Sequence, residues 1–295
     1  MNYRHAYHAG NFADVVKHIA LVAILLHLQK KDTPFAVIDS HAGRGSYDLA
    51  GDEAQKTGEA GAGIERLRGL TADGALGRYL EIVGGTSIYP GSPLIVAKLI
   101  RPQDRLVAVE KHPEEFTALK RALRPWRKAR AEEGDGYDRL MALLPPPERR
   151  GLVLIDPPFE AEDEFAAMAD ALRGAFKRFA NGVCLVWFPV KAESEVRRFL
   201  GEVLALGVTK ALRIDISINA VHSPARAEHA GGGDAVAGSR AGESREGNKP
   251  KLASAGLLII NPPFGFAEEM QEILDRITSL MSGQSSLEWL TGENA

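Results

Sequence analysis

The apolar residues of the chain follow two periods. Val15, Ile19, Val22 and Leu26 lie at helical spacing and predict a helix that begins after the cap residue Asn11 and ends near residue 30. Short continuous apolar runs predict buried strands at 36–39, 106–110, 151–156, 183–188, 211–218 and 255–260, with a further short strand before residue 135. Amphipathic stretches between them predict helices at 113–130, 136–143, 163–178, 191–206 and 266–281. This alternation is typical of an α/β fold whose mostly parallel sheet is covered by helices on both faces.

The first two predicted strands are unusually far apart. They end at Asp39 and Glu110, 71 positions from one another. A simple βαβ nucleotide fold has its acid roughly 20 residues beyond the glycine loop. We therefore expect one domain over 1–295 with an inserted helical subdomain at 48–88, which would include helices at 62–70 and 75–83. A crossover helix would then begin near Pro93. Residues 222–250 are rich in glycine and mixed charge, which predicts a long flexible loop.

Composition excludes several classes of protein. The net charge is −3, so a nucleic-acid contact would need a local basic surface, for which the stretch from Lys111 to Arg130 is a candidate. The single Cys184 excludes an internal disulfide and fits a reducing compartment. The most apolar segment, 19–26, is shorter than the ~20 residues of a membrane span. With no Cys/His metal spacing, we expect a cytoplasmic protein without a metal, a membrane contact or an evident obligate protein partner.

The strand at 151–156 ends in a sequence that suits chemistry on an amino group. Asp156 can accept a hydrogen bond from the exocyclic amine of adenine, and the carbonyl of Pro157 can accept from the same amine. Phe159 offers a flat face on which an extruded base could stack. The structural alternative is a strand stopped by Pro157 and Pro158, with Phe159 packed in the core.

A second motif, Asn261-Pro262-Pro263-Phe264, repeats the pattern after the strand at 255–260. Both copies cannot hold the same base. In a doubly wound sheet the first and fourth strands are neighbours at the switch point where ligands bind, which puts Asp156 at the pocket. The strand at 255–260 would be the seventh and would form a hairpin with the sixth. We therefore assign the chemistry to Asp156 and a structural role to Asn261.

The glycine loop favours a cofactor without phosphates. Gly43 and Gly45 begin a dinucleotide fingerprint, but Asp48 stands where the third glycine belongs and would repel a pyrophosphate. S-adenosylmethionine fits better. Glu110 at a strand end could hold its ribose hydroxyls, and Asp135 could accept from its adenine amine. The alternatives are a solvated strand-end charge for Glu110 and a turn residue for Asp135.

The N-terminal segment interleaves aromatic, imidazole and cationic side chains, among them Tyr3 and His5. Such a mixture suits an unpaired nucleic-acid strand, although a disordered terminus is the default expectation. One turn into the first helix, Lys17 and His18 could reach a cofactor carboxylate. Position alone favours a solvated lysine and a core histidine.

The same residues resemble the opening of the RlmJ family, bacterial 23S ribosomal RNA adenine-N6 methyltransferases. The resemblance runs in order along nearly the whole chain, through Tyr3-Arg4-His5, His8 to Asn11, Ala13 to Val15, Lys17-His18, His41 to Gly43, Tyr89 to Leu94, Glu110, Asp135-Gly136, Arg149 to Pro158, Lys177 to Ala180, Trp187, Pro189 and Asn261 to Pro263. It implies a Rossmann-like class I S-adenosylmethionine-dependent methyltransferase sheet with an inserted helical subdomain.

By position, the resemblance implies a cofactor pocket of His18, His41, Ser92, Glu110, Asp135, Gly136 and Asp156. It implies Asp156 as the catalytic acceptor and Tyr3 as an RNA contact, with His5 and Lys17 as helpers. Pro157 and Phe159, whose chemistry suits the target base, complete the predicted RNA contacts. Two features depart from the family: Phe159 stands where a tyrosine is frequent, and the 222–250 loop is long.

The sequence thus predicts transfer of a methyl group from S-adenosylmethionine to N6 of one adenine in 23S rRNA, presented unpaired or flipped into the pocket. A DNA adenine-N6 methyltransferase is the alternative within the same class. A non-catalytic RNA-binding module is the alternative from another class, and a nicotinamide-dependent oxidoreductase is a distant third.

Overall fold

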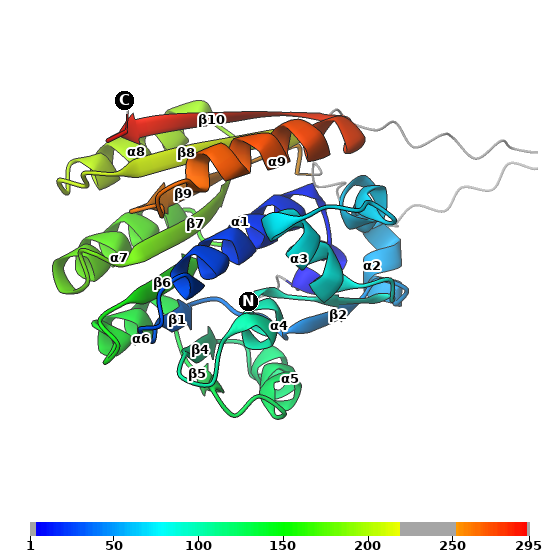
Figure 1. Ribbon diagram of the computed structural model, residues 1–295, viewed down its shortest axis with the longest axis horizontal. Helices are drawn as coiled ribbons and strands as arrows, with labels where there is room; N and C mark the ends of the chain where they lie inside the picture. The colour runs from blue at the N-terminus through cyan, green and yellow to red at the C-terminus, as the bar shows by residue number, and fades with distance from the viewer. Residues whose placement is uncertain (1–3, 219–251, 294–295) are drawn as a thin grey trace, which may run out of the picture.

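The computed structural model describes residues 4–218 and 252–293, through which one eight-stranded sheet runs in the order β10-β8-β9-β7-β6-β1-β4-β5 (Figure 1). Five strands are parallel: β1 (Ala36–Asp39), β4 (Arg105–Glu110), β5 (Ala129–Glu133), β6 (Gly151–Ile155) and β7 (Val183–Pro189). Three antiparallel pairings add β9 (Ser254–Ile260), β8 (Ala211–Ile218) and β10 (Gly283–Thr291). The predicted neighbours are confirmed, because β1 pairs with β6 and β8 pairs with β9.

Helices cover both faces of the sheet, as the alternation predicted. One face carries α1 (Phe12–Gln29), α4 (Ser92–Leu99), α5 (Pro113–Leu123) and α9 (Phe266–Leu280). The other carries α6 (Gly136–Leu143), α7 (Glu164–Arg178) and α8 (Glu193–Leu204). Successive residues of β6 alternate between two cores, since Leu152 and Leu154 pack in the first and Val153 and Ile155 in the second. Full burial on both faces explains why this strand is a continuous apolar run.

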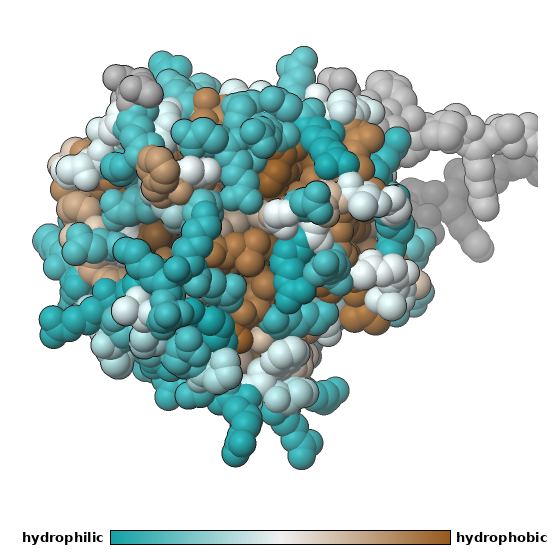
Figure 2. Space-filling model, viewed as in Figure 1, coloured by the Kyte–Doolittle hydropathy of each residue, from teal (hydrophilic) through white to brown (hydrophobic). Residues whose placement is uncertain are grey.

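The helix α1 is the centre of the first core. Asn11 caps it, because its side-chain oxygen accepts a hydrogen bond from the Asp14 N–H over 2.9 Å. By length and composition α1 could cross a membrane, but 83% of it is buried in the molecule, as in the core helix of a globular protein. Figure 2 shows this side of the molecule, with hydrophilic residues around its outline and apolar patches near its centre, where Figure 1 draws α1.

Between β1 and α4 the chain forms β2 (Ser46–Asp48), α2 (Asp52–Thr57), two 3-10 turns (Glu59–Ala62 and Ile64–Leu67), α3 (Gly74–Val83) and β3 (Ile88–Pro90). The antiparallel pair β2–β3 joins the two ends of this segment. The helix predicted at 75–83 is present. The one predicted at 62–70 is wrong, because the glycines at 63 and 69 interrupt it and leave a 3-10 turn at Ile64–Leu67. The single domain with an inserted subdomain at 48–88 stays a prediction.

Two further predictions are corrected. The helix expected to reach Arg130 ends at Leu123, ahead of Pro125, and Arg130 lies in the edge strand β5. The strand β10 was not predicted, because its residues are mostly polar and alternate between half-buried and exposed along the other edge of the sheet. The loop predicted at 222–250 and the RNA contact predicted at Tyr3 lie outside the described residues.

Candidate active site

The carboxyl ends of β1 and β6 form the switch point of the sheet, where loops diverge and ligands of α/β proteins bind. Asp39 ends β1 opposite Leu154, and Asp156 follows β6 by one residue. The two acids therefore lie at the same edge, beneath the N-terminal half of α1. Asp156 keeps 17% of its side chain exposed, whereas Asp39 is fully buried.

Lys17 connects α1 to this edge. Its ammonium donates to Asp156 Oδ2 in a short contact and to Asp14 Oδ1 over 2.8 Å, and its side chain is 4% exposed. Asp14 is 2% exposed, and its second oxygen accepts from His5 Nε2 over 2.8 Å and from the Gly10 N–H over 2.9 Å. The interpretation of Lys17 as a solvated residue is wrong, because the side chain is buried between two carboxylates.

Electrostatics keep Lys17 and Asp14 ionised. Burial alone would lower the pKa of Lys17, but the Asp14 and Asp156 carboxylates outweigh it and raise that pKa above its ordinary value. Burial alone would raise the pKa of Asp14, and the charges of His5 and Lys17 outweigh it and hold that pKa well below its ordinary value. Lys17 therefore retains its proton and cannot serve as a base.

Asp39 and Ser92 meet beside this network. Ser92, the first residue of α4, donates its hydroxyl to Asp39 Oδ2 over 2.7 Å. Burial raises the pKa of Asp39 to about 7, the Ser92 hydrogen bond offsets part of that shift, and the Asp156 carboxylate adds to it. Asp39 Oδ1 is buried without a hydrogen-bond partner among the described residues. A buried acceptor left unpaired is costly, so Asp39 Oδ1 is suited to a ligand that supplies a hydrogen-bond donor or a cation.

His18 faces the first core. It is 1% exposed, and its Nδ1 lies 2.8 Å from the hydroxyl of Tyr89, which lies 3.1 Å from the hydroxyl of Tyr79. Burial lowers the pKa of His18 to about 3, so the ring is neutral. The interpretation of His18 as a satisfied core histidine is thus confirmed, and its contact with a cofactor stays a prediction.

Glu110 and the glycine loop are bonded to each other. Glu110 is 5% exposed, and its two oxygens accept from the N–H groups of Gly43, over 2.8 Å, and His112, over 2.7 Å. Burial raises the pKa of Glu110, and these N–H groups oppose the rise. The alternative of a solvated strand-end charge is wrong. The carboxylate shapes the loop at the end of β4 that would face a ribose.

Asp135 is the N-cap of α6. Its Oδ1 accepts from the N–H groups of Tyr137 and Asp138, and its Oδ2 accepts from Lys111 Nζ over 3.0 Å. Burial alone would raise the pKa of Asp135, and the hydrogen bonds from Lys111 and Asp138 outweigh it and lower that pKa. The alternative of a turn residue is therefore partly right. Asp135 has a local structural role, because it caps α6 and fixes where that helix begins.

Gly136 lets α6 approach the loop after β1. A Cβ at this glycine would lie 2.1 Å from the carbonyl oxygen of Ser40 and 2.9 Å from the ring of His41, so only glycine fits. His41 also packs edge-on to Tyr137, with ring centroids 4.9 Å apart, and its Nδ1 lies 2.8 Å from the Ser40 hydroxyl. Burial lowers the pKa of His41 to about 4, so this ring is neutral too.

Phe159 packs on the second face of the sheet. It has φ 50°, and its ring lies edge-on to Phe165 at 5.0 Å and to Trp187 at 5.8 Å. A positive φ is rare for a bulky residue and marks this turn as strained. Packing against the core is what the structural alternative predicted, and stacking of a base on the remaining face stays a prediction.

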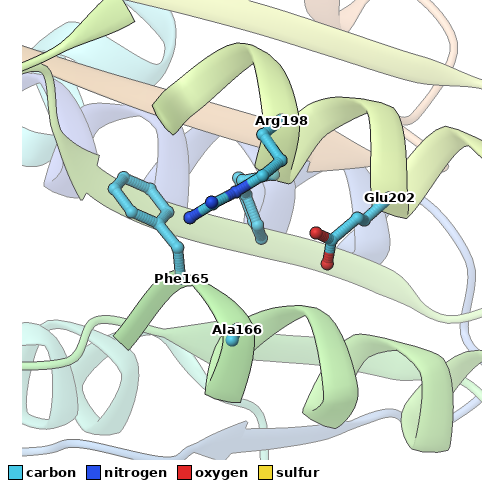
Figure 3. A pocket seen from close by; sticks show the side chains of 5 residues that line it. Phe165, Ala166, Arg198 and Glu202 are labelled. Carbon is cyan, nitrogen blue, oxygen red and sulfur yellow. The ribbon is translucent and has the colours of Figure 1, made fainter. Parts of the chain in front are cut away.

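A pocket of about 280 Å³ lies beyond Phe165, between α7 and α8. In Figure 3 the Phe165 ring and the Arg198 side chain point toward each other across it, from α7 and α8 respectively. Its other lining residues are Ala166, Phe199 and Glu202. None of the predicted site residues lines this pocket, so it is separate from the edge that holds Asp156.

The second Pro-Pro motif lies at the opposite end of the strands, where the parallel strands begin. β9 is antiparallel to β7, and its last residue Ile260 pairs with Cys184, near the start of β7. Asn261 has φ 53°, and its amide donates to the carbonyl oxygens of Ala180, over 2.8 Å, and Gly182, over 2.9 Å. These contacts give Asn261 a structural role and keep it away from Asp156.

The structure therefore gathers Lys17, Ser92 and Asp156 around the switch point, with Glu110, Asp135, Gly136 and His41 at the ends of neighbouring strands. His18 packs in the first core instead. Sequence reasoning missed Asp39 as a site residue. It did not consider Asp14 as a site residue either. The available signals were the position of Asp39 at the end of the first strand and the three-residue spacing of Asp14 and Lys17, which aligns them on one helix face.

Known proteins resemble this chain along its whole length. A family model described as "Ribosomal RNA large subunit methyltransferase D, RlmJ" matches residues 32–233. Ribosomal RNA large subunit methyltransferase J of Escherichia coli (strain K12) is 33% identical over 306 residues, which cover 99% of this chain and 100% of the relative. The protein of that name from Haemophilus influenzae is 34% identical over 305 residues, with the same coverage. The chain belongs to the RlmJ family.

The fold agrees with that membership. A crystal structure of a Legionella pneumophila protein superposes with a TM-score of 0.80 at 31% identity, and the match covers 97% of this chain and 99% of that one. The α/β class I fold, the assignment as a methyltransferase and the cofactor S-adenosylmethionine, which the sequence implied, are thereby confirmed. The residues at the switch point also fit this cofactor, because the unpaired Asp39 Oδ1 and the partly open Asp156 suit a cationic ligand.

Proposed function

We propose that this RlmJ-family protein transfers a methyl group from S-adenosylmethionine to N6 of one adenine in 23S rRNA. Its relatives are ribosomal RNA large subunit methyltransferases, which supports rRNA as the substrate. The observation that supports adenine as the target is the hydrogen bonding of Asp156. Lys17 donates to its Oδ2, and its Oδ1 accepts no hydrogen bond within the described part of the chain. The Oδ1 oxygen of Asp156 is thus open at the switch point for an amine donor, and Pro157 is the next residue in the chain.

In this mechanism Asp156 Oδ1 and the carbonyl of Pro157 accept the two N–H groups of the adenine amine and turn the nitrogen lone pair toward the methyl group. S-adenosylmethionine supplies an electrophilic methyl on a sulfonium. Lys17 fixes the Asp156 carboxylate and holds its own proton, so it acts as a clamp. The methylated nitrogen gives up one proton, which leaves to Asp156 or to water. Positioning and electrostatics supply most of the acceleration.

The pocket residues bind different parts of the cofactor in this proposal. Glu110 holds the ribose hydroxyls, and Asp135 accepts from the adenine amine of the cofactor. Ser92, which donates to Asp39, and His18, which follows Lys17 on α1, would bind its amino-acid end. His41 and Gly136 form the wall between, where the absence of a side chain on Gly136 leaves room for His41. Asp156 reaches both the cofactor and the target.

The RNA contacts form a second proposal. Tyr3, His5, Lys17, Pro157 and Phe159 would surround the unpaired or flipped adenine. Its phosphates would meet a basic surface, defined as the five exposed cations from the second half of α5 to the start of β5 that have no ion pair in the described residues: Lys120, Arg121, Arg124, Arg127 and Lys128. Hydrophilic side chains project from the lower edge of Figure 2, where Figure 1 draws α5.

Location and partners follow from the substrate. A protein that modifies ribosomal RNA works in the cytoplasm, and the single long apolar helix among the described residues is largely buried. We propose a cytoplasmic enzyme that needs 23S rRNA and no obligate protein partner.

The test is methyl transfer to protein-free 23S rRNA that lacks the modification, followed by mass mapping of the labelled nucleoside. We expect one N6-methyladenosine per rRNA. Competition between RNA and DNA oligonucleotides of the same sequence separates the proposal from a DNA methyltransferase, because only RNA should reduce labelling. Failure to bind S-adenosylmethionine in calorimetry would instead favour a non-catalytic RNA-binding module.

A further inference from the structure

The Asp14 carboxylate accepts more hydrogen bonds than an acid in the first turn of a helix needs. It lies in the first turn of α1 with 2% of its surface exposed, and each of its oxygens is used. Oδ1 accepts from the ammonium of Lys17, and Oδ2 accepts from His5 and from the Gly10 N–H. One buried carboxylate therefore ties together the N-terminal turn, the start of α1 and the lysine that contacts Asp156.

Lys17 needs this second carboxylate to have a fixed direction. A lysine ammonium sits on a flexible four-carbon stem, and burial penalises its charge. Asp14 supplies a counter-charge from one turn earlier on the same helix, at 2.8 Å. Asp156 supplies the other counter-charge from the end of β6. With both in place, the ammonium is held along the line from α1 to the catalytic carboxylate.

We propose that Asp14 is a positioning residue for methyl transfer, which fixes the Lys17 ammonium and through it the orientation of the Asp156 carboxylate. The inference rests on the proposed function, since it concerns the same acceptor. It adds that His5, in the segment expected to contact RNA, shares a carboxylate with the lysine clamp. The conformation of the N-terminal turn and the orientation of the Asp156 carboxylate are therefore coupled through the Asp14 side chain.

The charged and titratable groups around Lys17 come from several elements. They are Asp14 and His18 on α1, His5 in the N-terminal turn, Asp39 at the end of β1 and Asp156 after β6. Of the two carboxylates that raise the pKa of Lys17, Asp14 has the larger effect. Without it, burial and Asp156 would oppose each other, and the pKa of Lys17 would fall.

The test is a double-mutant cycle on the full chain with unmodified 23S rRNA. It compares Asp14→Asn, Lys17→Gln and the double variant by kcat, by KM for each substrate and by calorimetric binding of S-adenosylmethionine. We expect each single variant to lose ~10- to 100-fold in kcat, as for a misplaced catalytic group. The double variant should be no slower than Lys17→Gln, because Asp14 acts through Lys17. Losses that multiply in the double variant would overturn the proposal, as would an unchanged kcat in Asp14→Asn.

The matched control is Asp104→Asn. Asp104 is also fully buried and accepts from Arg101 and from the Phe35 N–H, at the amino edge of the sheet near the start of β4. Its neutralisation should cost stability but leave kcat per folded molecule unchanged. If Asp14→Asn alone does not fold, Lys17→Gln and the double variant still decide, because equal kcat values in those two support the proposal and a further loss in the double variant overturns it.

A pH profile separates positioning from a merely structural role. Protonated Lys17 is the active form, so the alkaline limb of kcat should lie at lower pH in Asp14→Asn than in the wild type. The same alkaline limb in both proteins would contradict the proposal. A wild-type protein that methylates no rRNA would instead refute the proposed function, which keeps the two failures distinct.

Discussion

The substitution Asp156→Asn tests the core of the mechanism, because it keeps the shape of the side chain and removes one acceptor. A carboxylate offers two acceptor oxygens, and an amide offers one. In the wild type Oδ2 receives the Lys17 ammonium and Oδ1 is open for the adenine amine. In Asp156→Asn an NH2 group must face one of these two donors. Since Lys17 is buried and keeps its proton, the amide oxygen should turn toward Lys17 and the NH2 group toward the substrate.

The magnitude follows from the lost hydrogen bond. A hydrogen bond to a charged group contributes about 1.5–3 kcal/mol. Its loss in the transition state corresponds to roughly a 10- to 150-fold lower kcat/KM, at 1.36 kcal/mol for each factor of ten. S-adenosylmethionine should still bind, because Asp39, Glu110 and Asp135 remain.

The assay is initial-rate methylation of unmodified 23S rRNA, read by mass spectrometry of N6-methyladenosine, with cofactor binding measured by calorimetry. The control is Asn261→Ala in the second Pro-Pro motif. It should lower the free energy of unfolding by about 1–3 kcal/mol through the loss of its bonds to Ala180 and Gly182, with unchanged kcat. Turnover of Asp156→Asn within about twofold of the wild type would refute this mechanism.

Three further predictions concern other parts of the site. Gly136→Ala places a Cβ 2.1 Å from the Ser40 carbonyl oxygen, so cofactor affinity should fall at least about tenfold in calorimetry; ordinary affinity would show that the loop yields. Arg124→Gln and Arg127→Gln should each reduce the slope of log RNA affinity against log salt by roughly 0.7–0.9, and Lys177→Gln on α7 should not. Folded Asp39 keeps its proton up to about pH 7, against 3.8 when unfolded, so its contribution to stability is present at acidic pH and lost as the pH rises to neutrality. Asp39→Asn should therefore gain stability over the wild type between those pH values in denaturant titrations, and a constant difference would contradict the raised pKa.

Much of the fold could be predicted from local sequence. The apolar runs at 151–155 and 183–188 form buried strands because each is covered on both faces. The cap at Asn11 and the apolar face that follows define α1. The pairing of β1 with β6 then followed from the rules of doubly wound sheets. The edge strand β10 was not predicted, and β5 was predicted only as a short strand before residue 135, because an edge strand is half solvated and its residues need not be apolar.

The sequence by itself also determined the chemistry available at the candidate site: an acid followed by two prolines, a glycine loop and acids at strand ends. The tertiary structure decided which charges meet. Lys17 and Asp156 are 139 positions apart, and no local period links them. Their contact depends on the placement of α1 over the β1–β6 pair. The proximity of Asp39 to Ser92 depends in the same way on the placement of α4 against β1. Apolar patterning records how deeply a residue is buried, whereas a pairing between buried charges depends on the relative position of whole elements, which only the packed sheet and helices fix.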